Sequence, residues 1–190
     1  LEILKNAGID PYPAKVPCDM ELSAAKADFK VLEKKGASVS LSGRVMAIRG
    51  QGAIFFVVLD DGTAKFQAVF KKDETDPALF KLFTDAADIG DIISITGTLF
   101  VTQRGEESLL AKTWAMASKS LLPLPEKWHG IQDEDERYRK RYLDLVMTPE
   151  LRDMFYKKAK FWNVTREFLN KHGFLEVETP TIETTTGGAE

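Results

Sequence analysis

Alternation of apolar and polar positions dominates the middle of the chain, where side chains with a period of two predict β-strands. A single amphipathic stretch, about Asp76 to Ala87, interrupts this pattern and predicts a helix, with Asp76 as a possible N-cap, Pro77 in the first turn and Gly90 after the end. The five predicted strands are Val39–Arg49, Ala53–Asp60, Ala64–Phe70, Ile92–Val101 and Leu109–Ala117.

The remaining periodic segments are helical. Leu22–Lys35 predicts a helix that Ser23 can cap and Gly36 can stop. Near the other end, Pro149–His172 predicts a long amphipathic helix followed by Gly173 at C′. Its apolar face consists of Leu151, Met154, Phe155, Ala159, Trp162, Thr165, Phe168, Leu169 and His172.

After that helix, Phe174–Thr179 alternates as a strand would, and Pro180 ends it. A helix and strand of this kind suggest a dimer interface, and an ordinary core helix is an equally fair interpretation.

These patterns divide the chain into four parts. Residues 1–36 form a polar lead-in and a helix, and the prolines of Asp10-Pro11-Tyr12-Pro13 exclude a helix there. Residues 37–120 carry the strands. Residues 121–132 read as a linker because Pro123 and Pro125 disfavour helix, and residues 133–190 turn helical.

Three strands, a helix and two more strands are the order of an OB-fold, a small barrel whose second and third strands bind oligonucleotides. An SH3-like barrel is the main alternative by strand number, but it lacks a full helix at that point. The expected fold class is therefore α+β: an N-terminal helix and a five-stranded OB-fold barrel, followed by helices and a strand.

The hairpin between the second and third strands suggests a binding surface. Asp61-Gly62 predicts a two-residue turn, which places Phe56 opposite Gln67 on the outer face and Phe55 in the core. An aromatic ring beside an amide is what a single-stranded base needs, and Arg49 can add a cation. The alternative is that Phe56 packs under a loop while Gln67 and Arg49 are merely solvated.

Composition narrows the class of protein. The 190 residues carry a formal net charge of −3, which counts mildly against a sequence-blind DNA binder. With one cysteine, Cys18, and only His129 and His172, we expect no disulfide framework and no transition metal. We expect no membrane-spanning segment and no signal peptide. We therefore expect a cytoplasmic location.

Several strings resemble one family. GFLEVETPTI, through Gly173, Phe174, Val177 and Pro180, is similar to motif 1 of class II aminoacyl-tRNA synthetases. A preceding OB-fold is the arrangement of the lysine, aspartate and asparagine subgroup. PLPEKWHG, DERYRKRYLDL, GIDPYP and the GGA after motif 1 resemble lysyl-tRNA synthetases, and the resemblance covers nearly all of the chain.

The resemblance implies roles for particular residues. In this subgroup the barrel stacks the central uridine of the anticodon on a phenylalanine, with a glutamine and an arginine on the base; the matching positions are Phe56, Gln67 and Arg49. Motif 1 implies a homodimer. Gly187, Gly188 and Ala189 match the start of a lysine-binding loop, for which a flexible chain end is the alternative.

The resemblance also implies a reaction. The full enzyme would use ATP and Mg²⁺ to convert lysine to lysyl-adenylate and would transfer the lysyl group to tRNA(Lys). Motifs 2 and 3, which hold ATP, are not among these residues, so we expect residues 1–190 to be a fragment without aminoacylation activity, bound cofactor or catalytic residue. An aspartate or asparagine ligase of the same subgroup, and a stand-alone OB-fold nucleic-acid-binding protein, remain as alternatives.

Charged runs beside the linker have simpler interpretations. Asp133-Glu134-Asp135-Glu136 is expected at a helix N-terminus rather than at a metal. Arg137, Arg139, Lys140 and Arg141 either form ion pairs within the chain or touch tRNA phosphate, and Trp128 is expected to anchor the linker.

Overall fold

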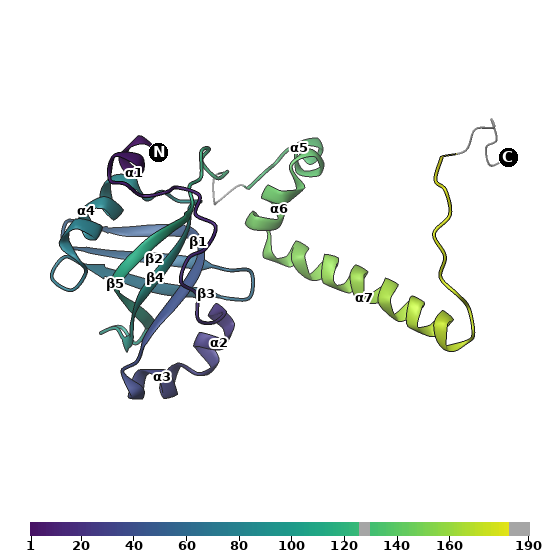
Figure 1. Cartoon of the computed structure of the whole chain (residues 1–190), viewed down its shortest axis with the longest axis horizontal. Helices are drawn as coiled ribbons and strands as arrows, with labels where there is room; N and C mark the ends of the chain where they lie inside the picture. Colours follow the sequence, from purple (N-terminus) through teal and green to yellow (C-terminus); the bar gives the residue numbers. More distant parts are fainter. Residues whose placement is uncertain (126–129, 183–190) are drawn as a thin grey trace. The chain divides into compact units, whose positions relative to one another are not determined.

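The computed structural model describes residues 1–125 and 130–182, and it divides the chain into two compact units, Leu1–Leu124 and Pro125–Glu190. The linker predicted from the sequence, residues 121–132, includes the boundary between these two units. Each unit is described by itself (Figure 1).

The first unit is a closed barrel with strand order β1-β2-β3-β5-β4, in which β1 also pairs with β4. All neighbours are antiparallel except β3 and β5. This is the predicted fold. The strands are β1 (Ser38–Gln51), β2 (Ile54–Asp60), β3 (Lys65–Lys71), β4 (Ile92–Val101) and β5 (Glu107–Ser118).

Helix α4 (Pro77–Ala86) joins β3 to β4, as predicted. The Asp76 carboxylate accepts hydrogen bonds from the amides of Ala78 and Leu79, so it is the predicted N-cap. The helix docks through Phe83, whose ring stacks on Phe70 with centroids 4.0 Å apart and meets Trp114 edge-on at 5.6 Å. These aromatic contacts close one end of the barrel core.

Three short helices precede the barrel: α1 (Glu2–Asn6), α2 (Leu22–Ala27) and α3 (Phe29–Lys35). The single helix predicted over Leu22–Lys35 is broken at Asp28, and Glu21 rather than Ser23 occupies its N-cap position. Gly36 ends α3 with a left-handed φ of 58°, as predicted.

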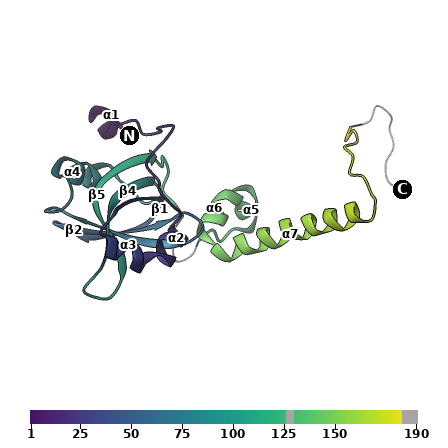
Figure 2. The same ribbon diagram turned by 60° about the horizontal axis from the view of Figure 1, so that its bottom comes forward.

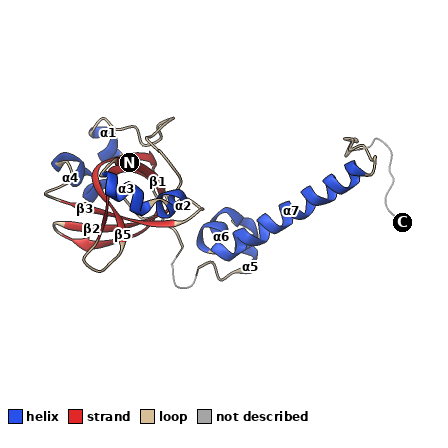
Figure 3. Cartoon of the chain, turned by 90° about the horizontal axis from the view of Figure 1, so that it is seen from below, coloured by secondary structure: helices blue, strands red, loops and turns tan. Residues whose placement is uncertain are grey.

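The lead-in also contains α1, which the sequence pattern did not predict. Helix α1 lies beside α4, whereas α2 and α3 cover the other end of the barrel (Figures 1 and 3). These helices contribute buried side chains to the same core as the strands, namely Leu4, Leu22, Ala25 and Phe29.

The second unit contains α5 (Glu134–Arg139), α6 (Arg141–Met147) and α7 (Pro149–Lys171), which follow one another in Figure 2. The predicted long helix is therefore confirmed. Its end is a Schellman motif, because Phe174 N–H donates to the Leu169 carbonyl and Gly173 N–H to the Asn170 carbonyl. Gly173 has the left-handed φ of 84° that this motif requires.

Candidate nucleic-acid interface

The two adjacent phenylalanines of β2 face opposite sides of the barrel wall. Phe55 points inward, with its ring centroid 5.8 Å from that of Phe80 and 6.3 Å from that of Phe83. Phe56 is half-buried on the outer face. The orientation predicted from the hairpin, with Phe55 toward the core and Phe56 on the outer face, is confirmed.

The predicted pairing across this hairpin is wrong by two residues. Asp60 pairs with Lys65, so Phe56 lies opposite Val69, and Gln67 lies opposite Val58. Because the shift is an even number of residues, Phe56 and Gln67 still share the outer face, as diagonal neighbours rather than direct partners. Long side chains bridge such diagonals, so the pair remains usable by one base.

The shift arises because side chains close this turn. The loop runs from Asp61 to Ala64, and the Asp61 Oδ1 accepts hydrogen bonds from the amides of Thr63 and Ala64 at 2.8 and 3.1 Å. Its Oδ2 accepts the amide of Leu22, in the first turn of α2, at 2.7 Å. These contacts favour a wider loop than the two-residue turn.

Arg49 reaches the outer face through a bulge. The register of β1 against β2 shifts between Val45 and Ala47, so Ile48 turns toward the core and Arg49 turns outward. Arg49 then pairs directly with Phe56. Within the described residues its exposed guanidinium has no hydrogen bond or ion pair, so it is available to a ligand.

Gln67 is held by a buried serine. Its Nε2 donates to the Ser108 Oγ at 2.8 Å, and the Ser108 Oγ donates to the Glu106 carbonyl at 3.2 Å. Ser108 is wholly buried. The sequence pattern missed this residue because the fifth strand was predicted to begin at Leu109; extending the period-two alternation back to Glu107 would have included it.

Around these residues the outer face is apolar at its floor and cationic at its sides. Val69 is 1% exposed beneath the surrounding side chains. The Lys71 ammonium lies 5.5 Å from the centroid of the Phe100 ring, a cation–π contact on the same outer surface. An aromatic shelf, an amide and cations are the elements by which proteins hold one unpaired base and its backbone.

Comparison with known proteins agrees with this geometry. A family model described as an OB-fold nucleic acid binding domain matches residues 39–116, and one for class II (D, K and N) tRNA synthetases matches residues 133–190. Lysine–tRNA ligases of Moorella thermoacetica and Roseiflexus sp. (strain RS-1) are each 42% identical over the whole chain. That of Carboxydothermus hydrogenoformans is 41% identical over the same extent.

The chain belongs to the class II lysine–tRNA ligase family. It spans 38% of the Moorella and Carboxydothermus proteins and 39% of the Roseiflexus protein. The class II match also disfavours a stand-alone OB-fold protein.

The residues predicted to belong to motif 1 follow the end of α7. Gly173 is the C′ residue, whereas Phe174 and Val177 are each 65% exposed. The strand predicted over Phe174–Thr179 is wrong: the segment joins no described strand, and a strand needs a neighbour to satisfy its backbone. Gly187, Gly188, Ala189, Trp128 and His129 lie outside the described residues.

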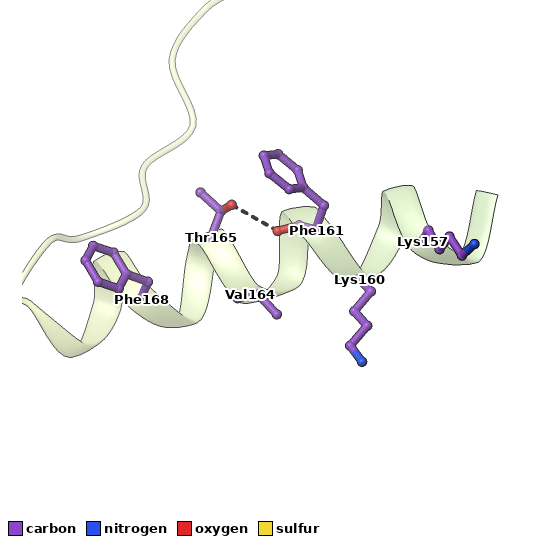
Figure 4. Close-up of a pocket in the computed structure, with 6 residues that line it drawn as sticks. All are labelled: Lys157, Lys160, Phe161, Val164, Thr165 and Phe168. Carbon is purple, nitrogen blue, oxygen red and sulfur yellow. Dashed lines mark hydrogen bonds between the residues drawn. The ribbon is translucent and has the colours of Figure 1, made fainter. Parts of the chain in front are cut away.

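Several apolar side chains of helix α7 are exposed within the described part of the chain. Of the predicted face, Trp162 and Phe168 are more than half exposed. An open groove follows a neighbouring stripe of the helix, shown in Figure 4 with the Thr165 hydroxyl donating to the Phe161 carbonyl at 2.9 Å. It is lined by Lys157, Lys160, Phe161, Val164, Thr165 and Phe168.

The charged run before α7 forms ion pairs, as one of its two interpretations predicted. Asp133 caps α5, its side chain accepting the amide of Glu136 at 2.9 Å. Arg137 and Arg141 converge on the buried Asp144, at 3.2 and 2.9 Å. The other two pairs are Arg139–Asp135 at 2.6 Å and Lys140–Glu136 at 2.7 Å.

Among the described residues, no group of three or more His, Cys, Asp or Glu side chains is arranged to bind a metal ion. No helix in the described part is long and apolar enough to span a membrane.

Proposed function

We propose that this chain supplies anticodon recognition to a lysine–tRNA ligase, with the central uridine stacked on Phe56 and contacted by Gln67 and Arg49. The observation that supports this proposal is the arrangement around Phe56: Arg49 is its direct partner on β1, and Gln67 is its diagonal neighbour on β3. Three separate strands thus contribute one group each to the same small area.

The groups are complementary to uracil. The ring supplies a stacking surface for any base, and the Gln67 amide supplies both an acceptor and a donor for the Watson–Crick edge. One N–H of Gln67 Nε2 is used by Ser108, which leaves the second N–H and Oε1 for the base. The Arg49 guanidinium adds donors for uracil oxygens or for phosphate.

The whole protein is proposed to convert lysine and ATP to lysyl-adenylate and to transfer the lysyl group to tRNA(Lys) in the cytoplasm. ATP supplies the adenylyl group, with Mg²⁺ as its counterion. The described residues contain no cluster of carboxylate or imidazole groups that fits such an ion. That residues 1–190 alone lack aminoacylation activity stays a prediction, which a turnover assay free of host enzyme checks.

The dimer is likewise proposed from the resemblance to motif 1 and from the apolar side chains of α7 that are exposed among the described residues. The choice of lysine over aspartate or asparagine rests on the relatives, which are lysine–tRNA ligases at 41–42% identity. The Arg49, Phe56 and Gln67 trio does not make this choice, because all three kinds of anticodon share the central uridine.

Binding of an anticodon stem-loop tests the proposal. The central uridine is replaced by cytidine, and the loss of affinity is measured for the wild-type chain and for Gln67→Ala. Wild type is expected to lose much more affinity than the variant, because only wild type reads the base edge. Equal losses would show that Gln67 reads nothing.

A further inference from the structure

The orientation of the Gln67 amide is fixed by its hydrogen bond to Ser108. Ser108 is wholly buried, so water does not replace a hydrogen bond that its hydroxyl loses. The hydroxyl proton goes to the Glu106 carbonyl, which also accepts the amide of Thr102 at 2.9 Å. Lone pairs of the Ser108 Oγ are therefore what faces Gln67, and they accept from Nε2.

Reversal of this amide is disfavoured by the same contacts. If Oε1 faced Ser108, two acceptors would meet unless the hydroxyl turned toward Gln67. Turning it would break the hydrogen bond from Ser108 to the Glu106 carbonyl, which would keep the Thr102 amide as its partner among the described residues. The nitrogen of Gln67 is thus held toward β5, and its oxygen is held away from β5.

Orientation matters because uracil and cytosine differ in where they donate. Uracil donates from N3 and accepts at O4, whereas cytosine accepts at N3 and donates from N4. Suppose both bases stack in the same position. An amide oriented to hydrogen-bond uracil then places donor against donor and acceptor against acceptor on cytosine, whereas the reversed amide can hydrogen-bond cytosine. A freely rotating glutamine would accept both bases, and a fixed one selects between them.

We propose that Ser108 is a positioning residue whose hydroxyl fixes the Gln67 amide in the orientation that selects uracil over cytosine. This inference rests on the proposed function, because it assigns the cause of selectivity at the same site. Ser108 itself touches no base, and it acts through Gln67 alone.

The test uses the full chain and two anticodon stem-loops that differ only in a central uridine or cytidine. Ser108→Ala is expected to reduce the preference for uridine about 10-fold, the equivalent of one mismatched hydrogen bond. The cytidine stem-loop should bind Ser108→Ala more tightly than it binds wild type, since the freed amide can reverse. A merely structural role for Ser108 would weaken both stem-loops and would not produce this gain.

Matched variants separate the effect from general destabilisation. Ser94→Ala also removes a buried hydroxyl, one that donates to the Pro17 carbonyl, and should leave the preference unchanged. Ser108→Thr keeps the hydroxyl and should restore the preference. Ser108→Cys nearly preserves the side-chain volume but offers a weaker hydrogen-bond acceptor, so it should lower the preference for uridine. This variant tests the role of the hydroxyl if Ser108→Ala does not fold.

The possible failures are distinguishable. In one outcome, wild type prefers uridine, Gln67→Ala loses that preference and Ser108→Ala keeps it. That outcome overturns the role of Ser108 and leaves the proposed function standing. Equal weakening of both stem-loops by Ser108→Ala overturns the inference in the same way. If wild type binds both stem-loops equally, the reading by Gln67 and the inference are overturned together.

Discussion

Arg49 lies directly opposite Phe56 across β1 and β2, and the two share a face only because β1 carries a bulge between Val45 and Ala47. Without the extra residue, Arg49 would point where Val45 does, into the core. The candidate site thus depends on backbone irregularity as much as on its side chains.

Gly50, the next residue, is expected to be essential to this geometry. Its φ is 124°, and a Cβ there would lie 2.2 Å from the Ile54 carbonyl oxygen. Gly50→Ala should therefore cost about 1–3 kcal/mol in the free energy of unfolding, measured by urea denaturation. It should also weaken stem-loop binding, because the strained turn joins Arg49 to the strand that carries Phe56.

Gly52→Ala is the matched control in the same turn. Its φ is 72°, but nothing lies within 4 Å of an added Cβ, so only the backbone cost of about 1 kcal/mol is expected. Similar losses for the two variants would contradict the claim that close approach of the backbone constrains Gly50.

Asp61 should make stability fall in acid. Burial raises the pKa of Asp61, but hydrogen bonds from the Leu22 amide and then from Thr63 and Ala64 outweigh it, and the net direction is downward. A carboxyl whose pKa is lower in the folded state stabilises the fold above its unfolded pKa of about 3.9. That stabilisation is lost as the pH falls through the lower, folded pKa.

The check is the urea midpoint between pH 7 and pH 3 for wild type and Asp61→Asn. The variant keeps an acceptor oxygen but has no charge to lose, so its midpoint should fall less steeply in the acid range. Parallel pH profiles would remove Asp61 from the account of acid stability.

Lys119 should be among the costliest single charges to remove. Its Nζ lies 2.8 Å from the carboxylate of Asp91, which is fully buried, and it also donates to the Ala86 carbonyl. Lys119→Met would leave the Asp91 charge buried and uncompensated, with an expected loss of about 3–5 kcal/mol in unfolding free energy.

Lys81→Met provides the comparison. The Lys81–Asp85 pair is 2.6 Å long but exposed, so its loss should cost no more than about 0.5 kcal/mol by the same denaturation measurement. Comparable losses for the two variants would contradict the importance of burial at Lys119.

The sequence predicted the barrel well because each strand obeys a local rule. Phe66, Ala68 and Phe70 alternate inward, and Asp76-Pro77 begins α4, since periodicity and capping act between near neighbours. The face of Phe56 followed from the same alternation.

What the sequence missed depends on distant contacts. The turn at Asp61 is widened by a bond to Leu22, 39 positions away, and Gln67 is held by Ser108, 41 positions away. Alternation over Phe174–Thr179 predicted a strand, but a strand exists only where another strand pairs with it. Local patterns contain no information about such partners.

The most direct test of the central claim is the affinity of Phe56→Ala for an anticodon stem-loop. If the ring supports a stacked base, the variant should lose about 1–3 kcal/mol of binding free energy while keeping its fold by circular dichroism. Ile54→Ala, two residues earlier on the same outer face, should change affinity little. An unchanged affinity of Phe56→Ala would contradict the account and remove Phe56 from the site.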